Sequence, residues 1–197
     1  MSQKTALITG GSRGLGRDMA INLAKDGVNV MFTYHSNLEK ANEVVREVES
    51  LDQKAKAFQF DANDPNSTKS LMNQVTEYLQ NENGSNHFDY LINNAGTGTL
   101  NMVVNTSDEQ FNEMMNIHLK SVYFLTQKAI PYLNDGGRIV NISSGLARFS
   151  LPGMSAYAIM KGAIEVFTRY LAKELGEKNN GEYYCSWRHC NRVCWRQ

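Results

Sequence analysis

The sequence predicts an α/β fold, a doubly wound parallel sheet with helices on both faces, and three observations lead to this prediction. Short apolar runs alternate along the chain with longer segments in which apolar residues recur every three or four positions. Several of the short runs are largely apolar, as are the strands of a sheet that is covered on both faces. Glycine-rich or polar motifs follow these runs, at the strand ends where open parallel sheets bind ligands.

The first half of the chain is expected to hold strands at 6–8, 28–33 and 56–60 and helices at 15–25, 38–51 and 67–79. The first helix carries Leu15, Met19 and Leu23 at every fourth position and ends before a glycine. The second has an apolar stripe opposite its charges, and the third shows the same amphipathic pattern. The third strand ends at Asp61.

The second half continues the alternation after a polar loop at 81–86. A strand at 88–92 ends in the motif Asn93-Asn94-Ala95-Gly96, and a fifth strand at 137–142 ends at Ser143-Ser144. Long helical patterns cover 107–133 and 155–175. There is no internal repeat and no low-complexity segment.

Length and charge restrict the class of protein. The 197 residues suffice for one domain with a hydrophobic core. The 20 basic and 20 acidic side chains cancel, so the composition shows no electrostatic preference for nucleic acid or an anionic membrane. The apolar run near the N-terminus is too short for a signal peptide, so a cytoplasmic protein is expected. Residues 1–184 contain no cysteine, which argues against a disulfide framework.

A glycine-rich turn follows the first strand and opens the first helix. It reads Thr9-Gly10-Gly11-Ser12-Arg13-Gly14-Leu15-Gly16. Glycines let the backbone turn tightly and approach a pyrophosphate, whose charge is favoured at a helix N-terminus. The turn therefore predicts a nucleotide site, although its G-x-x-x-G-x-G spacing differs from the usual G-x-G-x-x-G. A strand-to-helix turn without a ligand is the alternative.

Tyr157 and Lys161 are four residues apart in the last predicted helix and therefore share one face. A phenol is a weak acid at neutral pH, and a nearby ammonium group favours its phenolate form. Such a tyrosine can exchange a proton with a substrate oxygen, and a hydroxyl such as that of Ser144 can hold the same oxygen. Taken alone, the pair is more consistent with an ordinary exposed contact.

Taken together, these motifs resemble those of the short-chain dehydrogenase/reductase family. The glycine turn, Asn93-Asn94-Ala95-Gly96, Ser144 and Tyr157-x-x-x-Lys161 occur in the order and at the separations of that family, and the likeness covers about residues 4–178. The resemblance implies a Rossmann-like catalytic domain at residues 1–180. It also implies an oxidoreductase that interconverts a carbonyl and an alcohol with a nicotinamide cofactor.

The resemblance implies a role for each matching residue. Tyr157 would be the general acid/base, Ser144 would polarise the substrate carbonyl, and Lys161 would hold the nicotinamide ribose and favour the tyrosinate. Asn116 matches the family asparagine that anchors a water in the proton relay, whereas His118 is interpreted as a helix residue near the floor of the site. No metal ligand is expected. The residues expected to bind the cofactor are Gly10, Ser12, Arg13, Gly14, Leu15, Gly16, Tyr34, Asp61, Asn93, Ala95, Gly96, Tyr157 and Lys161, and those expected to bind the substrate are Ser144 and Tyr157.

The end of the second strand favours NADP over NAD. NAD-binding folds place a carboxylate there, about 20 residues after the first glycines, to bind the ribose 2′-hydroxyl. This strand runs instead into Tyr34-His35-Ser36-Asn37, which holds no group that repels a 2′-phosphate. Arg13 in the glycine turn is placed to pair with that phosphate. NADP is the expected cofactor, with NAD as the alternative.

The substrate and the partners follow only from the resemblance. Residues 97–103 and 146–154 would border the substrate pocket, and their mixed composition does not choose among an acyl thioester, as in a 3-oxoacyl-carrier-protein reductase, a sugar and a small ketone. A homotetramer or a dimer built on the two long helices is expected. The alternative function is that of a non-catalytic nucleotide-binding protein or an inactive truncated product.

Residues 181–197, GEYYCSWRHCNRVCWRQ, differ in character from the rest of the chain. The family would continue here with a sixth strand and a Pro-Gly turn, so the fold is expected to lack its C-terminal strands. A zinc site is disfavoured because the three cysteines and His189 lack the usual paired spacing. A reading-frame shift of one nucleotide converts both tryptophan codons to glycine codons and can restore the missing strand. The segment is therefore interpreted as an out-of-frame tail that leaves the catalytic domain incomplete.

Overall fold

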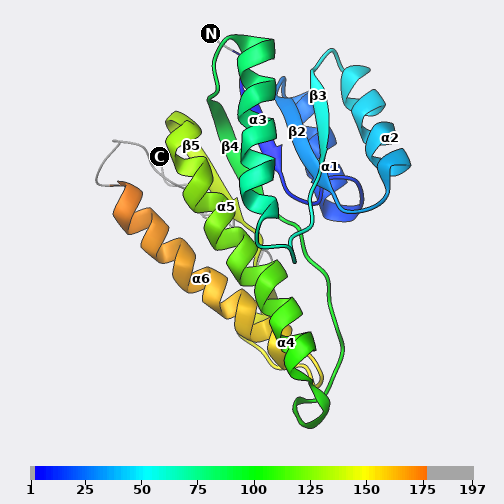
Figure 1. Cartoon of the computed structure of the whole chain (residues 1–197), viewed down its shortest axis with the longest axis vertical. Coiled ribbons are helices and arrows are strands. Elements are labelled where there is room, and N and C mark those ends of the chain that lie inside the picture. Colours follow the sequence, from blue (N-terminus) through cyan, green and yellow to red (C-terminus); the bar gives the residue numbers. More distant parts are fainter. Residues whose placement is uncertain (1–2, 177–197) are drawn as a thin grey trace.

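The computed structural model describes residues 3–176, which form a five-stranded parallel sheet with helices on both faces (Figure 1). The order of the strands in the sheet is β3-β2-β1-β4-β5. The doubly wound α/β prediction is confirmed. The predicted out-of-frame tail at 181–197 lies outside the described residues. The strands are β1 (Thr5–Ile8), β2 (Asn29–Tyr34), β3 (Ala55–Gln59), β4 (Phe88–Asn93) and β5 (Leu133–Asn141).

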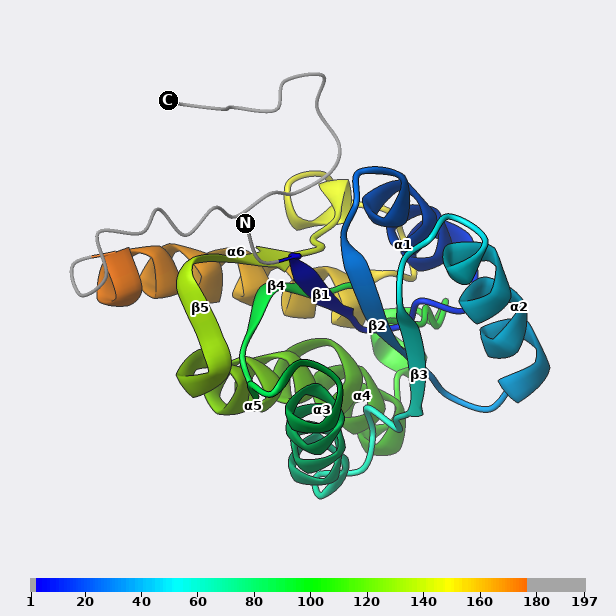
Figure 2. The ribbon, with the colours of Figure 1, turned by 90° about the horizontal axis from the view of Figure 1, so that it is seen from above.

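The described region holds six α-helices, of which the last, α6, follows the last strand. Helices α1 and α2 lie on one face, and α3 and α5 on the other (Figure 2). None of the described helices is long and apolar enough to cross a membrane. The helices are α1 (Gly14–Lys25), α2 (Leu38–Glu49), α3 (Ser67–Asn83), α4 (Asp108–Met115), α5 (Ser121–Ala129) and α6 (Ser155–Gly176).

Alternate residues along each strand contribute their side chains to two separate hydrophobic clusters, one on each face of the sheet. Leu7 and Leu91 point to the α3/α5 face, whereas their neighbours Ile8 and Ile92 point to the α1/α2 face. This alternation follows from the two-residue period of a strand. Because both faces are covered, all four residues of β1 are buried, as the apolar sequence of that strand predicted.

The segment predicted as one helix at 107–133 is divided in the structure. Helix α4 passes through a π-helical turn, Asn116–Lys120, into α5, and a short 3₁₀ turn at Ile130–Tyr132 ends the run. Pro131 lies in that last turn, where its missing N–H cannot continue an α-helix. Strand β5 then begins at Leu133, four residues before the predicted start, and its register against β4 shifts beside Gly136, which has a φ of +73°.

A buried polar network ties α5 and α6 to the sheet. Asn93 donates to the hydroxyl of Thr126 at 2.9 Å and to Oδ1 of Asn141 at 2.8 Å. Asn141 in turn donates to the hydroxyl of Thr168 on α6 at 2.9 Å. These four side chains are at most 7% exposed, so the hydrogen bonds form away from water and restrict how α6 can slide along the sheet.

Candidate active site

A groove of about 710 Å³ opens at the carboxyl ends of the strands. It lies where β1 has β2 on one side and β4 on the other, which is the switch point at which open parallel sheets bind ligands. Its volume falls within the range of sites for small ligands, about 300–1,000 Å³. Residues 12–16, 33–37, 60–63 and 94–97 form most of its wall, with Gly10, Lys40, Glu113 and Ile117.

The glycine turn brings the N-terminus of α1 to this groove. Gly10 has a φ of +70°, a left-handed conformation that favours glycine. A Cβ on Gly16 would overlap the carbonyl oxygen of Gly10 and would lie 2.6 Å from Nδ2 of Asn94. No side chain caps α1, and its first turn contains no acidic residue. The free N–H groups of this turn therefore fit an anionic ligand such as a pyrophosphate.

Thr9 joins the end of β1 to the end of β4. Its hydroxyl oxygen accepts hydrogen bonds from the backbone N–H groups of Asn94 and Ala95, both at 2.9 Å. Asn94 returns two bonds, from Nδ2 to the carbonyl oxygens of Thr9 at 3.0 Å and Gly10 at 3.2 Å. The two motifs that the sequence predicts to bind the cofactor are thus held together by direct hydrogen bonds.

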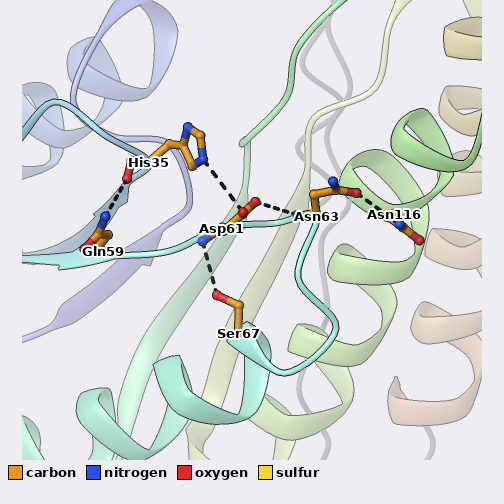
Figure 3. Close-up of polar contacts among 6 residues, drawn as sticks. All are labelled: His35, Gln59, Asp61, Asn63, Ser67 and Asn116. Carbon is orange, nitrogen blue, oxygen red and sulfur yellow. Dashed lines mark hydrogen bonds and ion pairs between the residues drawn. The ribbon is translucent and has the colours of Figure 1, made fainter. Parts of the chain in front are cut away.

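A second set of polar contacts lies where the loops after β2 and β3 line the groove, a part called here its outer end (Figure 3). Asp61 accepts a bond from the backbone N–H of Asn63 at 2.9 Å, and its carboxylate lies 3.9 Å from Nε2 of His35. Asn116 in the π-helical turn donates from Nδ2 to Oδ1 of Asn63 at 3.0 Å. These contacts connect the loops after β2 and β3 to the turn between α4 and α5.

Tyr157 and Lys161 lie together on α6, as their spacing predicted. The ammonium nitrogen of Lys161 is 5.6 Å from the centre of the Tyr157 ring, within the range of a cation–π contact. It donates to the carbonyl oxygen of Ile142 at 2.7 Å, and Lys161 is only 5% exposed. Burial lowers the pKa of Lys161 to about 8. Ser144, at the end of β5, accepts a bond from the N–H of Leu146 at 3.2 Å.

His118 lies beside Tyr157 and Lys161, in a helix at the floor of the candidate site, as the sequence suggested. It is 1% exposed, and its ring meets that of Tyr157 edge to face, with centres 5.0 Å apart. The pKa of His118 is lowered to about 4, mainly by burial and also by the nearby charge of Lys161, while a hydrogen bond to Thr97 opposes both effects. The imidazole is therefore neutral at physiological pH.

The structure separates some residues that the sequence grouped together. The side chain of Asn116 bonds to Asn63 at the outer end of the groove, and no hydrogen bond among the described residues joins it to Tyr157 or Lys161. Asn93, predicted to bind the cofactor, is 4% exposed and belongs to the buried network beneath the groove. Both differences arise because the direction of a side chain depends on the elements that pack against it.

Tyr157 and Lys161 are not among the residues that line the groove, but most other predicted cofactor residues are. These others are Gly10, Ser12, Arg13, Gly14, Leu15, Gly16, Tyr34, Asp61, Ala95 and Gly96. The sequence analysis missed Lys40, Glu113 and Ile117, which reach the groove from α2, α4 and the π-helical turn. No local motif marks these three, because only the packing of those elements brings them to the sheet edge.

Comparison with known proteins gives consistent matches. The family model described as short chain dehydrogenase matches residues 4–180. A hydroxynaphthalene reductase from Aspergillus fumigatus is 33% identical over 178 residues, which cover 90% of this chain and 63% of that reductase.

Solved structures agree with this assignment. The crystal structure of an angucycline C-6 ketoreductase with bound NADP has a TM-score of 0.86 and 33% identity, covering 88% of this chain and 68% of that one. A short chain dehydrogenase from Burkholderia cenocepacia in complex with NADP has a TM-score of 0.83 and 36% identity, covering 90% and 70% of the two chains.

The buried His118 predicts a loss of stability in acid. An unfolded histidine binds its proton near pH 6.5, whereas folded His118 binds it only near pH 4. The free energy of unfolding is therefore not reduced by this group above pH 6.5, and it falls as the pH drops from 6.5 towards 4. Between pH 7 and pH 5, urea unfolding of the parent should lose about 2 kcal/mol more than that of His118→Gln.

The exposed His35 provides the control for this comparison, because its side chain is 73% exposed. His35→Gln should leave the acid sensitivity of the parent unchanged. Equal acid sensitivity in the parent and His118→Gln would contradict the assignment of a neutral, buried His118.

Proposed function

Because the chain belongs to the short-chain dehydrogenase family, we propose that it is an NADP-dependent oxidoreductase that interconverts a carbonyl and an alcohol. The observation that carries the proposal is the position of the buried ammonium of Lys161 beside the ring of Tyr157 on α6. Residues 1–180 form the catalytic unit in this proposal, and the tail at 181–197 contributes no site. The absence of a membrane-spanning helix among residues 3–176 is compatible with the cytoplasmic location that the sequence suggests.

Tyr157 moves the proton in the proposed reaction. In reduction, its hydroxyl donates a proton to the carbonyl oxygen as the carbonyl carbon gains a hydride, and the product is an alcohol. A nicotinamide bound in the groove would supply that hydride, with its two electrons. The positive charge of Lys161 near the ring stabilises the tyrosinate that remains, and the hydroxyl of Ser144 holds the substrate oxygen. The reverse steps oxidise the alcohol.

The groove fits NADP at both of its ends. The uncapped N-terminus of α1 would hold the pyrophosphate, and Asp61, at the outer end, would lie near the adenine. No carboxylate follows β2, whereas Arg13 and Lys40 both line the groove. Arg13 is exposed and forms no ion pair with the residues that the structure describes, so its guanidinium is available for a 2′-phosphate.

Two loops favour a bulky apolar ketone as the substrate. The loops after β4 and β5 meet where the N–H of Asn101 donates to the carbonyl oxygen of Gly153 at 2.8 Å. They carry the exposed side chains of Leu100, Met102, Val103, Val104, Phe149 and Leu151. The hydroxynaphthalene reductase and the angucycline ketoreductase are, by their names, enzymes of aromatic compounds. An aromatic ketone is therefore the first candidate, ahead of a 3-oxoacyl thioester or a sugar.

The burial of Lys161 argues against a protein that only binds nucleotides. An ammonium group that is 5% exposed destabilises the fold, as its lowered pKa indicates, and no carboxylate among the described residues pairs with it. Ionisable groups perturbed in this way concentrate at catalytic sites. A dehydrogenase has a use for such a charge beside Tyr157, whereas a nucleotide sensor does not.

Replacement of the proposed acid/base tests the function directly. Tyr157→Phe should lower kcat with NADPH at least about a hundredfold, because it removes only the hydroxyl that carries the proton. Turnover is measured on a panel of an α-tetralone, an acetoacetyl thioester and a keto sugar. NADPH affinity, followed by fluorescence, should change less than about twofold. Tyr170→Phe on the exposed side of α6 is the control, and turnover retained by Tyr157→Phe would show that another group carries the proton.

The choice of cofactor depends on Arg13. NADPH should bind at least about tenfold more tightly than NADH, a difference of about 1.4 kcal/mol. Arg13→Gln should remove most of that preference by weakening NADPH alone. The control is Arg17→Gln, since Arg17 is already paired with Glu47 outside the groove. Equal affinities for the two cofactors in the parent would contradict the proposal.

We also propose that the chain associates with itself through α5 and α6. Tyr123 and Phe124 on α5 and Val166 and Tyr170 on α6 are 43–63% exposed, and the rings of Tyr123 and Phe167 lie 4.7 Å apart across the two helices. Exposed aromatic groups gathered on adjacent helices are typical of protein interfaces.

If α5 and α6 form the interface, a charged residue introduced on them should change the oligomeric state of the protein. The parent should sediment as a dimer or a tetramer, whereas Tyr170→Glu should weaken the association at least about tenfold, because a carboxylate is costly to bury in an interface. Leu38→Glu, on the distant α2, is the control, and a monomeric parent would end the proposal.

A further inference from the structure

His118 contacts two parts of the site that are far apart in the sequence. Its Nε2–H donates to the carbonyl oxygen of Thr97, in the loop that follows β4, at 2.7 Å. Its ring also packs against Tyr157 on α6, with an angle of 85° between the ring planes. One side chain thus connects the wall of the groove to the proposed acid/base.

The position of the His118 imidazole accounts for the presence of glycine at position 96, where a side chain would collide with it. A Cβ on Gly96 would lie 2.7 Å from Cε1 and 3.2 Å from Nδ1 of His118. The φ of Gly96 is not in the left-handed region, so the backbone conformation by itself does not require glycine there. Gly96 also lines the groove, which means that its main chain lies between the cofactor site and the imidazole.

The hydrogen bonds of His118 offer no path by which a proton could pass between its ring and Tyr157. The N–H of Thr97 lies 3.3 Å from Nε2, but the carbonyl oxygen of Thr97 is nearer, at 2.7 Å, and can only accept, so the proton is assigned to Nε2 and Nδ1 is a bare acceptor. Nδ1 is buried, has no hydrogen-bond partner among the described residues, and lies 3.2 Å from the point that a Cβ on Gly96 would occupy. The ring therefore contacts Tyr157 by packing alone.

We propose that His118 is a positioning residue that sets the spacing between the Gly96–Thr97 wall of the groove and the ring of Tyr157. The inference rests on the proposed function of Tyr157 and assigns no proton transfer to His118. The hydrogen bond fixes the imidazole to the end of β4, and the edge-to-face contact fixes Tyr157 to the imidazole. A catalytic group displaced by even a small distance loses much of its rate, which is why such a spacer matters.

Two substitutions separate the two contacts. His118→Phe keeps a ring against Tyr157 but loses the donor, whereas His118→Gln keeps an N–H that reaches Thr97 but loses the ring. Each should lower kcat about tenfold, with KM for the carbonyl and Kd for NADPH within about threefold of the parent, when assayed well below the melting temperature. Unchanged kcat in both variants would overturn the proposal, as would a change confined to stability.

A double-mutant cycle tests the contact between Gly96 and His118. Gly96→Ala should lower kcat about tenfold or more in the parent, because the methyl group displaces the imidazole. In the His118→Ser background the same change should cost less than about threefold, since the space is then free. Gly162→Ala is the control, because a Cβ at that helix position meets nothing within 4 Å. Equal losses in both backgrounds would show that Gly96 does not serve to admit His118.

A measurement without turnover distinguishes this inference from the proposed function. In NMR spectra of the full chain, the ring protons of His118 should shift when Tyr157→Leu removes the facing aromatic ring, and should keep their positions in Tyr157→Phe. A parent that reduces no carbonyl would contradict the proposed function, and the Gly96–His118 cycle would then be measured through NADPH affinity. If the chemical shifts of the His118 ring protons stayed unchanged in Tyr157→Leu, the positioning role itself would be contradicted.

Discussion

The site depends above all on the hydrogen bonds that join the end of β1 to the end of β4. The hydroxyl of Thr9 accepts two backbone N–H groups from the loop after β4, and Asn94 returns two bonds to the glycine turn. These two strands are neighbours in the sheet but 80 residues apart in the chain, so the bonds set the distance between the two motifs that line the groove. Gly16 contributes by leaving room for Asn94 to reach across.

Helix α6, which carries Tyr157 and Lys161, is held by polar contacts as well as by apolar packing. The network from Asn93 through Asn141 to Thr168 links α6 to β4 and β5, and Lys161 adds a bond to the end of β5. Buried hydrogen bonds of this kind contribute modest stability but define one arrangement, since any shift leaves a buried group without a partner. The fold thereby keeps Lys161 beside Tyr157 despite the cost of burying its charge.

The elements and the motifs could be read from the sequence to different degrees. Short apolar runs located all five strands of the described region, although β5 starts four residues early because its first residues pair with β4 across a bulge. The helix predicted at 107–133 contains a π-helical turn, which hydrophobic periodicity does not reveal. The spacing of Tyr157 and Lys161 correctly predicted that both lie on one face of α6, because residues four apart are neighbours on the surface of a helix.

The sequence by itself determined the alternation of strands and helices, and with it the parallel sheet and the edge where a ligand binds. It also determined which chemical groups stand at that edge, because the motifs follow the strands directly. Only the tertiary structure decided that Asn116 bonds to Asn63, that Asn93 lies beneath the groove, and that His118 meets Gly96 and Tyr157. Periodicity is a local property of the chain, whereas the direction of a side chain between elements depends on the packing of segments that are distant in sequence.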